Sequence, residues 1–336
     1  MDELNRTIVE KLIRKTLRDI KDSPDRSLRN LVDLGVQLTK GRFQTLIFHS
    51  AQKMLKNPLS NYYALFYDMV LNTDEDRLVN FSLNLGFNSF TLGAKKIRET
   101  ESKENFDIPW SVFLDIDSDT LKSRADIYNG IIGQGLRTGI YTWLIRLDKK
   151  IYNIFPIIKN NPDCTFILFC PSKEITPSVM DDAAEIKNIM FAPFYDEETE
   201  KACSLLRESR MLYALAYSYD SSNILSVIKD ELVAYIETMH PSFTIMMPSE
   251  SCSVSCQKEM AAFVNENRNK QKYKTVLWEI YSDNRFIDGI ISDNDCFCSF
   301  GKSGNLILQS PHKEVYNIFE TSLKNIFSSV FPKKIF

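Results

Sequence analysis

The sequence lacks any long uninterrupted run of apolar residues. No run reaches the roughly 18 residues that a membrane-spanning helix requires. The opening stretch MDELNRTIVEKLIRK alternates charged with apolar residues and has no apolar signal-peptide core. We therefore expect no transmembrane segment and a cytoplasmic location. An excess of positive charge is also missing, because the net charge is −3. A broad cationic surface, and with it a nucleic-acid partner, is not expected.

Histidine is scarce, and the short catalytic motifs are absent. The 3 histidines, His49, His240 and His312, lie far apart, and none has a ligand-like neighbour in the sequence. There is no G-x-G-x-x-G or Walker loop, no H-E-x-x-H and no G-x-S-x-G. These absences argue against nucleotide hydrolysis, zinc peptidase chemistry and serine hydrolase chemistry.

Cysteine is present, but its pattern does not indicate a disulfide scaffold. The chain has 7 cysteines, an odd number in a long sequence, which favours free thiols in a reducing compartment. Cys252 and Cys256 are one weak metal-ligand pair, although Glu259 stands where a third cysteine would fall. Cys296 and Cys298 are a second weak pair. Ordinary thiols are the alternative interpretation of both pairs.

From residue 110 onward, short apolar runs alternate with helical patterns. A parallel sheet with helices outside it produces such a rhythm, and its sites lie at the carboxyl ends of the strands. We predict an α/β fold, an incomplete (β/α)6 TIM-like barrel over residues 106–272. The predicted strands are 110–116, 140–145, 165–169, 189–193, 211–217 and 243–247.

The flanking regions differ from this rhythm. Residues 1–105 show the helical spacing of apolar residues and carry no motif that indicates a function. Residues 273–336 are rich in turn signals, including Gly304-Asn305, and end in a helical pattern over 314–330. We predict a helical N-terminal region, the barrel, and a small α+β C-terminal extension.

Several segments resemble radical-SAM enzymes that carry a SPASM-like extension. The resemblance rests on their order and spacing between residues 108 and 330. The segment IPWSVFLD (108–115) resembles the first barrel strand of that family. The other similar segments are 163–176, 186–194, 217–223 and 243–248 in the barrel, and 285–289, Cys296 and 316–323 in the extension. The resemblance implies a barrel that binds SAM and a 4Fe–4S cluster, followed by a SPASM/twitch-like remnant over 273–336.

Two family motifs are missing from their expected places. The resemblance places a C-x-x-x-C-x-x-C cluster loop after Asp117, but Ser118-Asp119-Thr120-Leu121 follows and holds no cysteine. It places a G-G-E-P turn, which faces the SAM amine, after Ile145, where the chain reads RLDK. A SAM-cleaving cluster needs three thiolates and one open iron. We therefore predict no cofactor, although the family implies SAM and a 4Fe–4S cluster.

A pocket is expected at the mouth of the barrel. Asp115 and Asp117 could bind a cation or act as acid and base, or they could cap the next helix or pair with lysine. Arg146 and Asp148 share the rim and could pair across the former SAM position. The tyrosines could line a pocket for a flat or peptide ligand, or pack in the core. The predicted pocket residues are Asp115, Asp117, Arg146, Asp148, Cys170, Tyr195, Tyr217, Tyr219 and Asn223.

These observations favour a degenerate radical-SAM-like protein without the SAM-cleaving site. Such a pseudoenzyme would act as a binding or scaffold subunit for a peptide or a catalytic homologue, because a fold alone does not confer activity. Two alternatives stay open. One is an atypical enzyme that uses the polar mouth of the barrel, and the other is an iron–sulfur protein with rearranged cysteine ligands.

Overall fold

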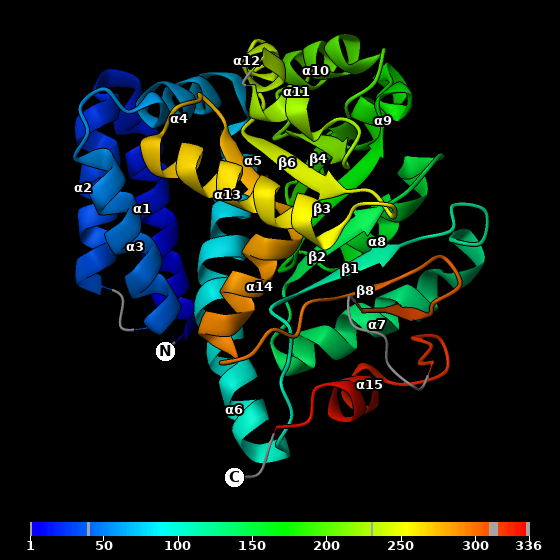
Figure 1. The fold of residues 1–336 in the computed structure, drawn as a ribbon. Helices are drawn as coiled ribbons and strands as arrows, with labels where there is room; N and C mark the ends of the chain where they lie inside the picture. Colours follow the sequence, from blue (N-terminus) through cyan, green and yellow to red (C-terminus); the bar gives the residue numbers. More distant parts are fainter. Residues whose placement is uncertain (1, 39–40, 230, 309–314, 334–336) are drawn as a thin grey trace.

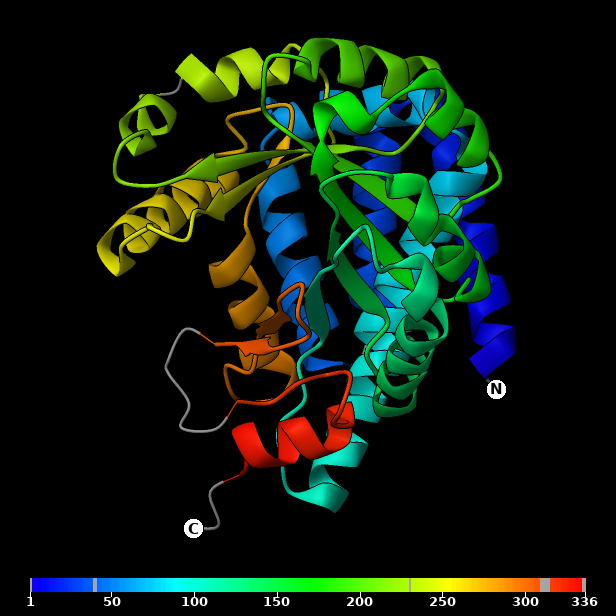
Figure 2. The same cartoon turned by 90° about the vertical axis from the view of Figure 1, so that its right-hand side faces the viewer.

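A curled nine-stranded sheet forms the centre of the molecule, with helices on both faces (Figures 1 and 2). The computed structural model describes residues 2–38, 41–229, 231–308 and 315–333. The strand order is β7-β6-β5-β4-β3-β2-β1-β8-β9, and every neighbouring pair is parallel except β8 and β9. The strands are β1 (Ser111–Asp115), β2 (Thr142–Arg146), β3 (Thr165–Pro171), β4 (Ile189–Phe194), β5 (Ala214–Tyr219), β6 (Phe243–Pro248), β7 (Val276–Glu279), β8 (Cys298–Phe300) and β9 (Leu306–Ile307).

The predicted α/β character is confirmed, but the predicted count of six strands is not. Strands β1 to β6 correspond to the six predicted runs, which are rich in the β-branched and aromatic residues that favour strands. The sheet then continues with β7 beside β6 and with β8 beside β1. Strands β7, β8 and β9 have only 4, 3 and 2 residues, too few to produce a periodic signal. Residues 273–336 therefore add strands to both ends of the sheet.

The outer face of the sheet is covered by the helices that connect the strands. Trp143, Phe166 and Phe191 are fully buried beneath them, and Trp143 lies beside Phe166 in register. Because a parallel sheet buries both of its faces, its strands are apolar almost throughout. The connecting helices are α7 (Ala125–Thr138), α8 (Phe155–Asn160), α9 (Pro177–Asp182), α10 (Thr199–Glu208), α11 (Ile224–Ile228), α12 (Glu231–Glu237) and α13 (Val254–Lys270).

The inner face of the sheet is covered by N-terminal helices. Ile20, Val70 and Phe81 come from three of these helices and share one apolar cluster with Ile167 and Met190 of the sheet. Part of the interior that an open barrel would leave to a ligand is therefore filled by the chain's own helices. These helices are α1 (Asp2–Asp22), α2 (Pro24–Leu38), α3 (Arg42–Leu55), α4 (Asn61–Asn72) and α5 (Glu75–Ser82).

One long helical rod links the N-terminal helices to the sheet. α5 continues into a π-helix (Leu83–Gly93) and then into α6 (Ala94–Glu104). The amide nitrogens of Asn84 and Asn88 donate to carbonyls just before β3, namely Cys164 O at 2.9 Å and Asp163 O at 2.9 Å. Gly93 passes so close to the end of α7 that an added Cβ would lie 2.5 Å from Gly139 O. These contacts fix the rod against the amino ends of β2 and β3.

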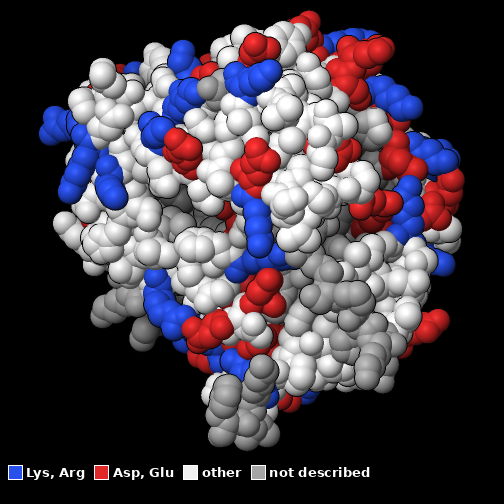
Figure 3. Space-filling model, in the orientation of Figure 1, with Lys and Arg blue, Asp and Glu red and all other residues white. Residues whose placement is uncertain are grey.

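The C-terminal segment folds back onto the start of the barrel. Trp110 N donates to Asp288 of α14 (Ile280–Ile291) at 2.8 Å. After α15 (Leu323–Val330), Asp107 N donates to Phe331 O at 2.8 Å, and the described chain ends beside α6. In the described residues, no helix combines the length and the apolar character needed to cross a bilayer. Figure 3 shows basic and acidic side chains interspersed over the face it displays.

Candidate functional site

The carboxyl ends of β1 and β2 carry an ion pair at the mouth of the half-barrel. Asp115 and Arg146 are register partners in the parallel ladder, so their side chains leave the sheet next to each other. Arg146 donates to Asp115 Oδ2, with side-chain exposures of 39% and 12% respectively. This hydrogen bond raises the pKa of Arg146 above its ordinary value. Asp115 Oδ1 is buried and accepts no hydrogen bond from any described residue.

A small cavity lies beside this ion pair. It is lined in part by Tyr281, Arg285 and Phe297, and its volume is about 100 Å³. Burial raises the pKa of Tyr281, and the positive charge of Arg146 opposes that rise. Sites for organic ligands typically have volumes of roughly 300–1,000 Å³. The cavity as it stands therefore fits water or a small group, and a molecule of the size of SAM does not fit.

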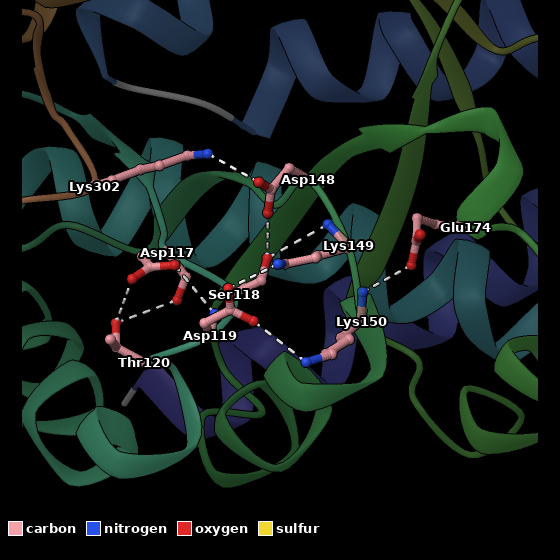
Figure 4. A network of polar contacts seen from close by, with 9 residues as sticks. All are labelled: Asp117, Ser118, Asp119, Thr120, Asp148, Lys149, Lys150, Glu174 and Lys302. Carbon is pink, nitrogen blue, oxygen red and sulfur yellow. Dashed lines mark hydrogen bonds and ion pairs between the residues drawn. The ribbon is translucent and has the colours of Figure 1, made fainter.

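The loops that surround the mouth are joined by a rim network of nine residues. Ser118 donates to Asp148 at 2.6 Å, and Lys302 of the β8–β9 hairpin reaches the same carboxylate at 3.0 Å. Together these bonds lower the pKa of Asp148, with Ser118 making the largest contribution. Figure 4 shows the network, which consists of Asp117, Ser118, Asp119, Thr120, Asp148, Lys149, Lys150, Glu174 and Lys302.

Further bonds of the rim network connect three successive strand-to-helix loops. Lys149 and Lys150 contact the two oxygens of Asp119 at 2.7 and 3.3 Å. The Lys150 backbone N–H donates to Glu174, after β3, at 2.8 Å. Most of these charged groups are about half exposed, and solvent screening makes such pairs weak contributors to stability. The network therefore positions the loops more than it stabilises the fold.

The structure separates the two predicted strand-end carboxylates. Asp117 accepts from Asp119 N at 3.1 Å and from the Thr120 hydroxyl at 3.1 Å, so it closes its own turn. Asp115 instead pairs with Arg146 on the sheet. Asp117 thus caps its own turn instead of the next helix, and Asp115 pairs with an arginine instead of a lysine. The expected pairing of Arg146 with Asp148 is wrong, because Asp148 binds Ser118 and Lys302.

The remaining predicted pocket residues lie elsewhere. Cys170 is fully buried within the apolar cluster of the outer face. The rings of Tyr195 and Tyr217 contact each other in a tilted arrangement, with centroids 5.7 Å apart and an interplanar angle of 58°. Asn223 closes the loop after β5, since it accepts from Asp220 N at 2.9 Å and donates to Ser218 O at 3.1 Å. Tyr219 is fully buried under α11 and α13. The structure therefore brings together Asp115 with Arg146 and Tyr195 with Tyr217, but not these pairs with each other.

The cysteines do not fit a 4Fe–4S cluster. All seven lie in the described part of the chain, and six of them are buried. Burial raises the pKa of Cys164 and of Cys203 to about 12. Cys252 and Cys256 are in hydrogen-bond contact, but no third thiol joins them. No three His, Cys, Asp or Glu side chains among the described residues group as metal ligands do.

Two buried carboxyl groups were not predicted from the sequence. Glu279, at the end of β7, accepts a hydrogen bond from the Tyr219 hydroxyl at 2.9 Å, and burial raises its pKa. Asp288 is fully buried, and burial raises its pKa well above the ordinary value. The sequence gives no signal for either, because a single acidic residue in an amphipathic stretch is usually exposed.

No family model and no curated protein sequence matches the chain. Solved structures of Streptococcus suis SuiB do match. The structure bound to S-adenosylmethionine has 10% identity and a TM-score of 0.51, covering 70% of this chain and 67% of that one. The structure bound to precursor peptide SuiA has 10% identity, a TM-score of 0.51, and coverages of 70% and 68%. A third SuiB structure has 9% identity, a TM-score of 0.50, and coverages of 69% and 68%. These similarities show a radical-SAM-like fold.

Proposed function

We propose that this chain is a cluster-free, radical-SAM-like pseudoenzyme that acts as a peptide-binding subunit. One observation carries the proposal. The loop after β1, where the family resemblance places the cluster ligands, holds no thiol and is bonded to the loop after β2 through Ser118 and Asp148. On this proposal, the side chains of these two loops stand where a cluster and its SAM would otherwise meet.

The arrangement of the inner face supports the same proposal. N-terminal helices pack against the middle of the inner face, and the cavity at the mouth is about 100 Å³. A binding function requires only an accessible surface with shape and charge, and Arg146 supplies a partly exposed cation there. The SuiB fold, found in one structure with a bound precursor peptide, makes a peptide the favoured partner class. A catalytic homologue would then modify the peptide that this chain presents.

Reconstitution tests the absence of a cluster. The full chain is incubated anaerobically with iron, sulfide and reductant, desalted, and assayed for iron and for visible absorbance. We expect no retained iron and no charge-transfer band. A thermal melt with SAM is expected to be unchanged, because only a ligand that binds the folded state raises the melting temperature. Stoichiometric iron with a visible band, or a saturable shift with SAM, would overturn the proposal.

Selection of peptides tests the binding function. A displayed peptide library is panned against the immobilised chain and counter-selected against the Asp115→Asn/Arg146→Met double variant. This variant removes the carboxylate and the guanidinium together and so leaves neither charge unpaired. We expect enriched peptides that bind the wild type and lose affinity for the double variant. No enrichment, or equal binding to both proteins, would contradict a peptide site at the mouth.

A second candidate function is an enzyme that uses the polar mouth for other chemistry. The buried Asp115 Oδ1, which has no hydrogen-bond partner among the described residues, favours this candidate. A carboxylate oxygen of that kind is able to accept a proton from a bound molecule. The Asp115→Asn variant separates the two functions, because it removes the base while keeping the shape. If the Asp115→Asn variant still binds peptide but has lost a catalytic activity that the wild type shows, the result would favour the second candidate function.

A further inference from the structure

A large groove lies at the far end of the barrel from the mouth, between α6, α7 and the start of α15. α7 follows β1 and runs back along the sheet, so its last turn lies at the amino ends of the strands (Figure 1). The groove has a volume of about 640 Å³, within the range of roughly 300–1,000 Å³ that organic ligands occupy. Its lining residues are Lys96, Glu99, Thr100, Lys103, Glu104, Gln134, Arg137, Thr138, Ser322 and Lys324.

The lining carries an excess of positive charge on a chain whose net charge is negative. Four of the lining residues are basic and two are acidic, whereas the whole chain has a net charge of −3. Both acids are already engaged, since Glu104 pairs with Lys324 at 2.9 Å and Glu99 pairs with Lys95 at 3.8 Å. Lys103 and Arg137 are exposed and form no ion pair within residues 2–38, 41–229, 231–308 and 315–333. Two cations therefore face the groove without neutralisation.

Crowding of like charges is a second feature of the groove. Lys96 donates to Leu136 O at 2.7 Å and is only partly exposed. Burial lowers the pKa of Lys96, and the nearby positive charge of Arg137 lowers it further. An anion bound between these two side chains would reduce the repulsion between their positive charges. This reduction in repulsion would favour binding of the anion.

The uncharged groups of the groove are also arranged as donors. Gln134 Oε1 accepts a hydrogen bond from the Leu323 backbone N–H at 2.8 Å. This bond uses only the oxygen, so the side-chain NH2 group of Gln134 can donate to a ligand. Ser322 caps α15 by accepting Asn325 N at 3.3 Å, so its hydroxyl hydrogen is available. The amino end of α15 carries the positive end of the helix dipole. The hydrogen-bond donors and the positive charges of the groove are together complementary to the oxygens of a carboxylate.

We propose that this groove binds an acidic peptide segment of a partner protein. A peptide supplies carboxylates for Lys103 and Arg137, and its backbone N–H groups suit the oxygens of Glu99. A nucleic-acid backbone offers only acceptors, whereas a peptide also carries N–H donors that suit the acidic side chains of the groove. The inference goes beyond the proposed function, because the groove and the mouth lie at opposite ends of the strands and use different residues.

The test is fluorescence anisotropy with the full chain at low ionic strength. The probe is a labelled peptide of alternating glutamate and glycine, and the control probe replaces glutamate with lysine. We expect saturable binding of the acidic peptide alone, weakened by added salt. The Lys103→Glu/Arg137→Glu double variant is expected to bind about tenfold more weakly. Lys258→Glu, which reverses an exposed charge on α13, is the matched control and should bind as the wild type does.

Two results would overturn the inference. One is that the acidic peptide does not bind, and the other is that the Lys103→Glu/Arg137→Glu variant binds it as tightly as the wild type does. Tighter binding of a single-stranded oligonucleotide would assign the groove to nucleic acid instead. Because Lys103 and Arg137 are exposed, the double variant should keep the wild-type thermal melt, and Lys103→Gln/Arg137→Gln repeats the measurement if it does not. The Asp115→Asn/Arg146→Met variant should retain acidic-peptide binding, which separates this test from that of the mouth.

Discussion

Ser118 donates its hydroxyl proton to Asp148 across 2.6 Å and thereby joins the loops that follow the first two strands. Ser118 is almost completely buried, whereas Asp148 is half exposed and also receives Lys302. The bond is a direct side-chain link between the loops after β1 and β2, and its Ser118 end is shielded from water. It is therefore the contact of the rim network whose removal should be measurable.

Replacing Ser118 by alanine should cost about 0.5–1.5 kcal/mol of unfolding free energy near neutral pH. The pKa of Asp148 is lowered in the folded state, so its contribution is present above the unfolded pKa and is lost as pH falls through the folded pKa. The difference between wild type and variant should therefore shrink in acid. Denaturant unfolding across pH measures it. The control is Ser123→Ala, which removes an exposed hydroxyl bonded only to Thr120 O; an equal loss there would contradict the prediction.

Replacing Arg146 by methionine should destabilise the protein by about 1–3 kcal/mol, because Asp115 would be left partly buried without its cation. The partial exposure of Arg146 keeps the loss below that of a fully buried pair. Adding Asp115→Asn should recover most of the loss, since the unpaired charge then disappears. Unfolding free energies of the two single variants and the double variant form the measurement. Additive losses would show that the two side chains are not coupled.

Replacing Gly93 by alanine should destabilise the protein by about 1–3 kcal/mol, because the new Cβ meets the Gly139 carbonyl and the helical rod must shift. Gly86 lies in the same π-helix with no atom within 4 Å of its virtual Cβ. Gly86→Ala is the matched control and should be neutral or stabilising by about 0.5–1 kcal/mol. Thermal melts of both variants give the comparison, and equal melting temperatures would refute the close approach.

Replacing Asp288 by asparagine should change how stability depends on pH. The pKa of Asp288 is raised in the folded state, so its stabilising contribution is present below the unfolded pKa and is lost as pH rises through the folded pKa. Asparagine keeps an acceptor for Trp110 N and never ionises. The variant should gain stability relative to wild type as pH rises above the ordinary range for aspartate. Parallel pH profiles of unfolding free energy would contradict this expectation.

A thiol reagent should label Cys252 before the other cysteines. Cys252 is partly exposed, and the other six are buried. Because burial raises the pKa of Cys252 to about 12, labelling should accelerate with rising pH. Peptide mass mapping of the native protein should find one labelled site, and Cys252→Ser should remove it. Early labelling of Cys296 or Cys298 would show that the end of the sheet near β8 opens.

The six central strands could be predicted because each is a short apolar run bounded by helical patterns. Which face of each strand points inward could not be predicted, because both faces are buried and the runs are apolar throughout. Tyr217 and Tyr219 show the difficulty. Their spacing correctly implies a shared face, but that face is the one packed under helices, away from Asp115 and Arg146.

The rod over residues 75–104 shows a second limit. Residues 78–88 fit a strand or a helix end equally well from their apolar spacing. Their helical conformation depends on Asn84 and Asn88 reaching carbonyls about 75–80 positions further along the chain. Such long-range partners are invisible to local pattern. The same holds for the basic groove, whose lining comes from α6, α7 and α15.

The placement of β1 between β2 and β8 has a consequence for biosynthesis. β2 emerges from the ribosome soon after β1, but β8 lies some 180 residues later in the chain. Until then one flank of β1 is an unpaired edge, and open edges invite association with other chains. We therefore expect the nascent protein to depend on a holdase-type chaperone from the emergence of β1 until the emergence of β8, and to complete this part of its sheet only then.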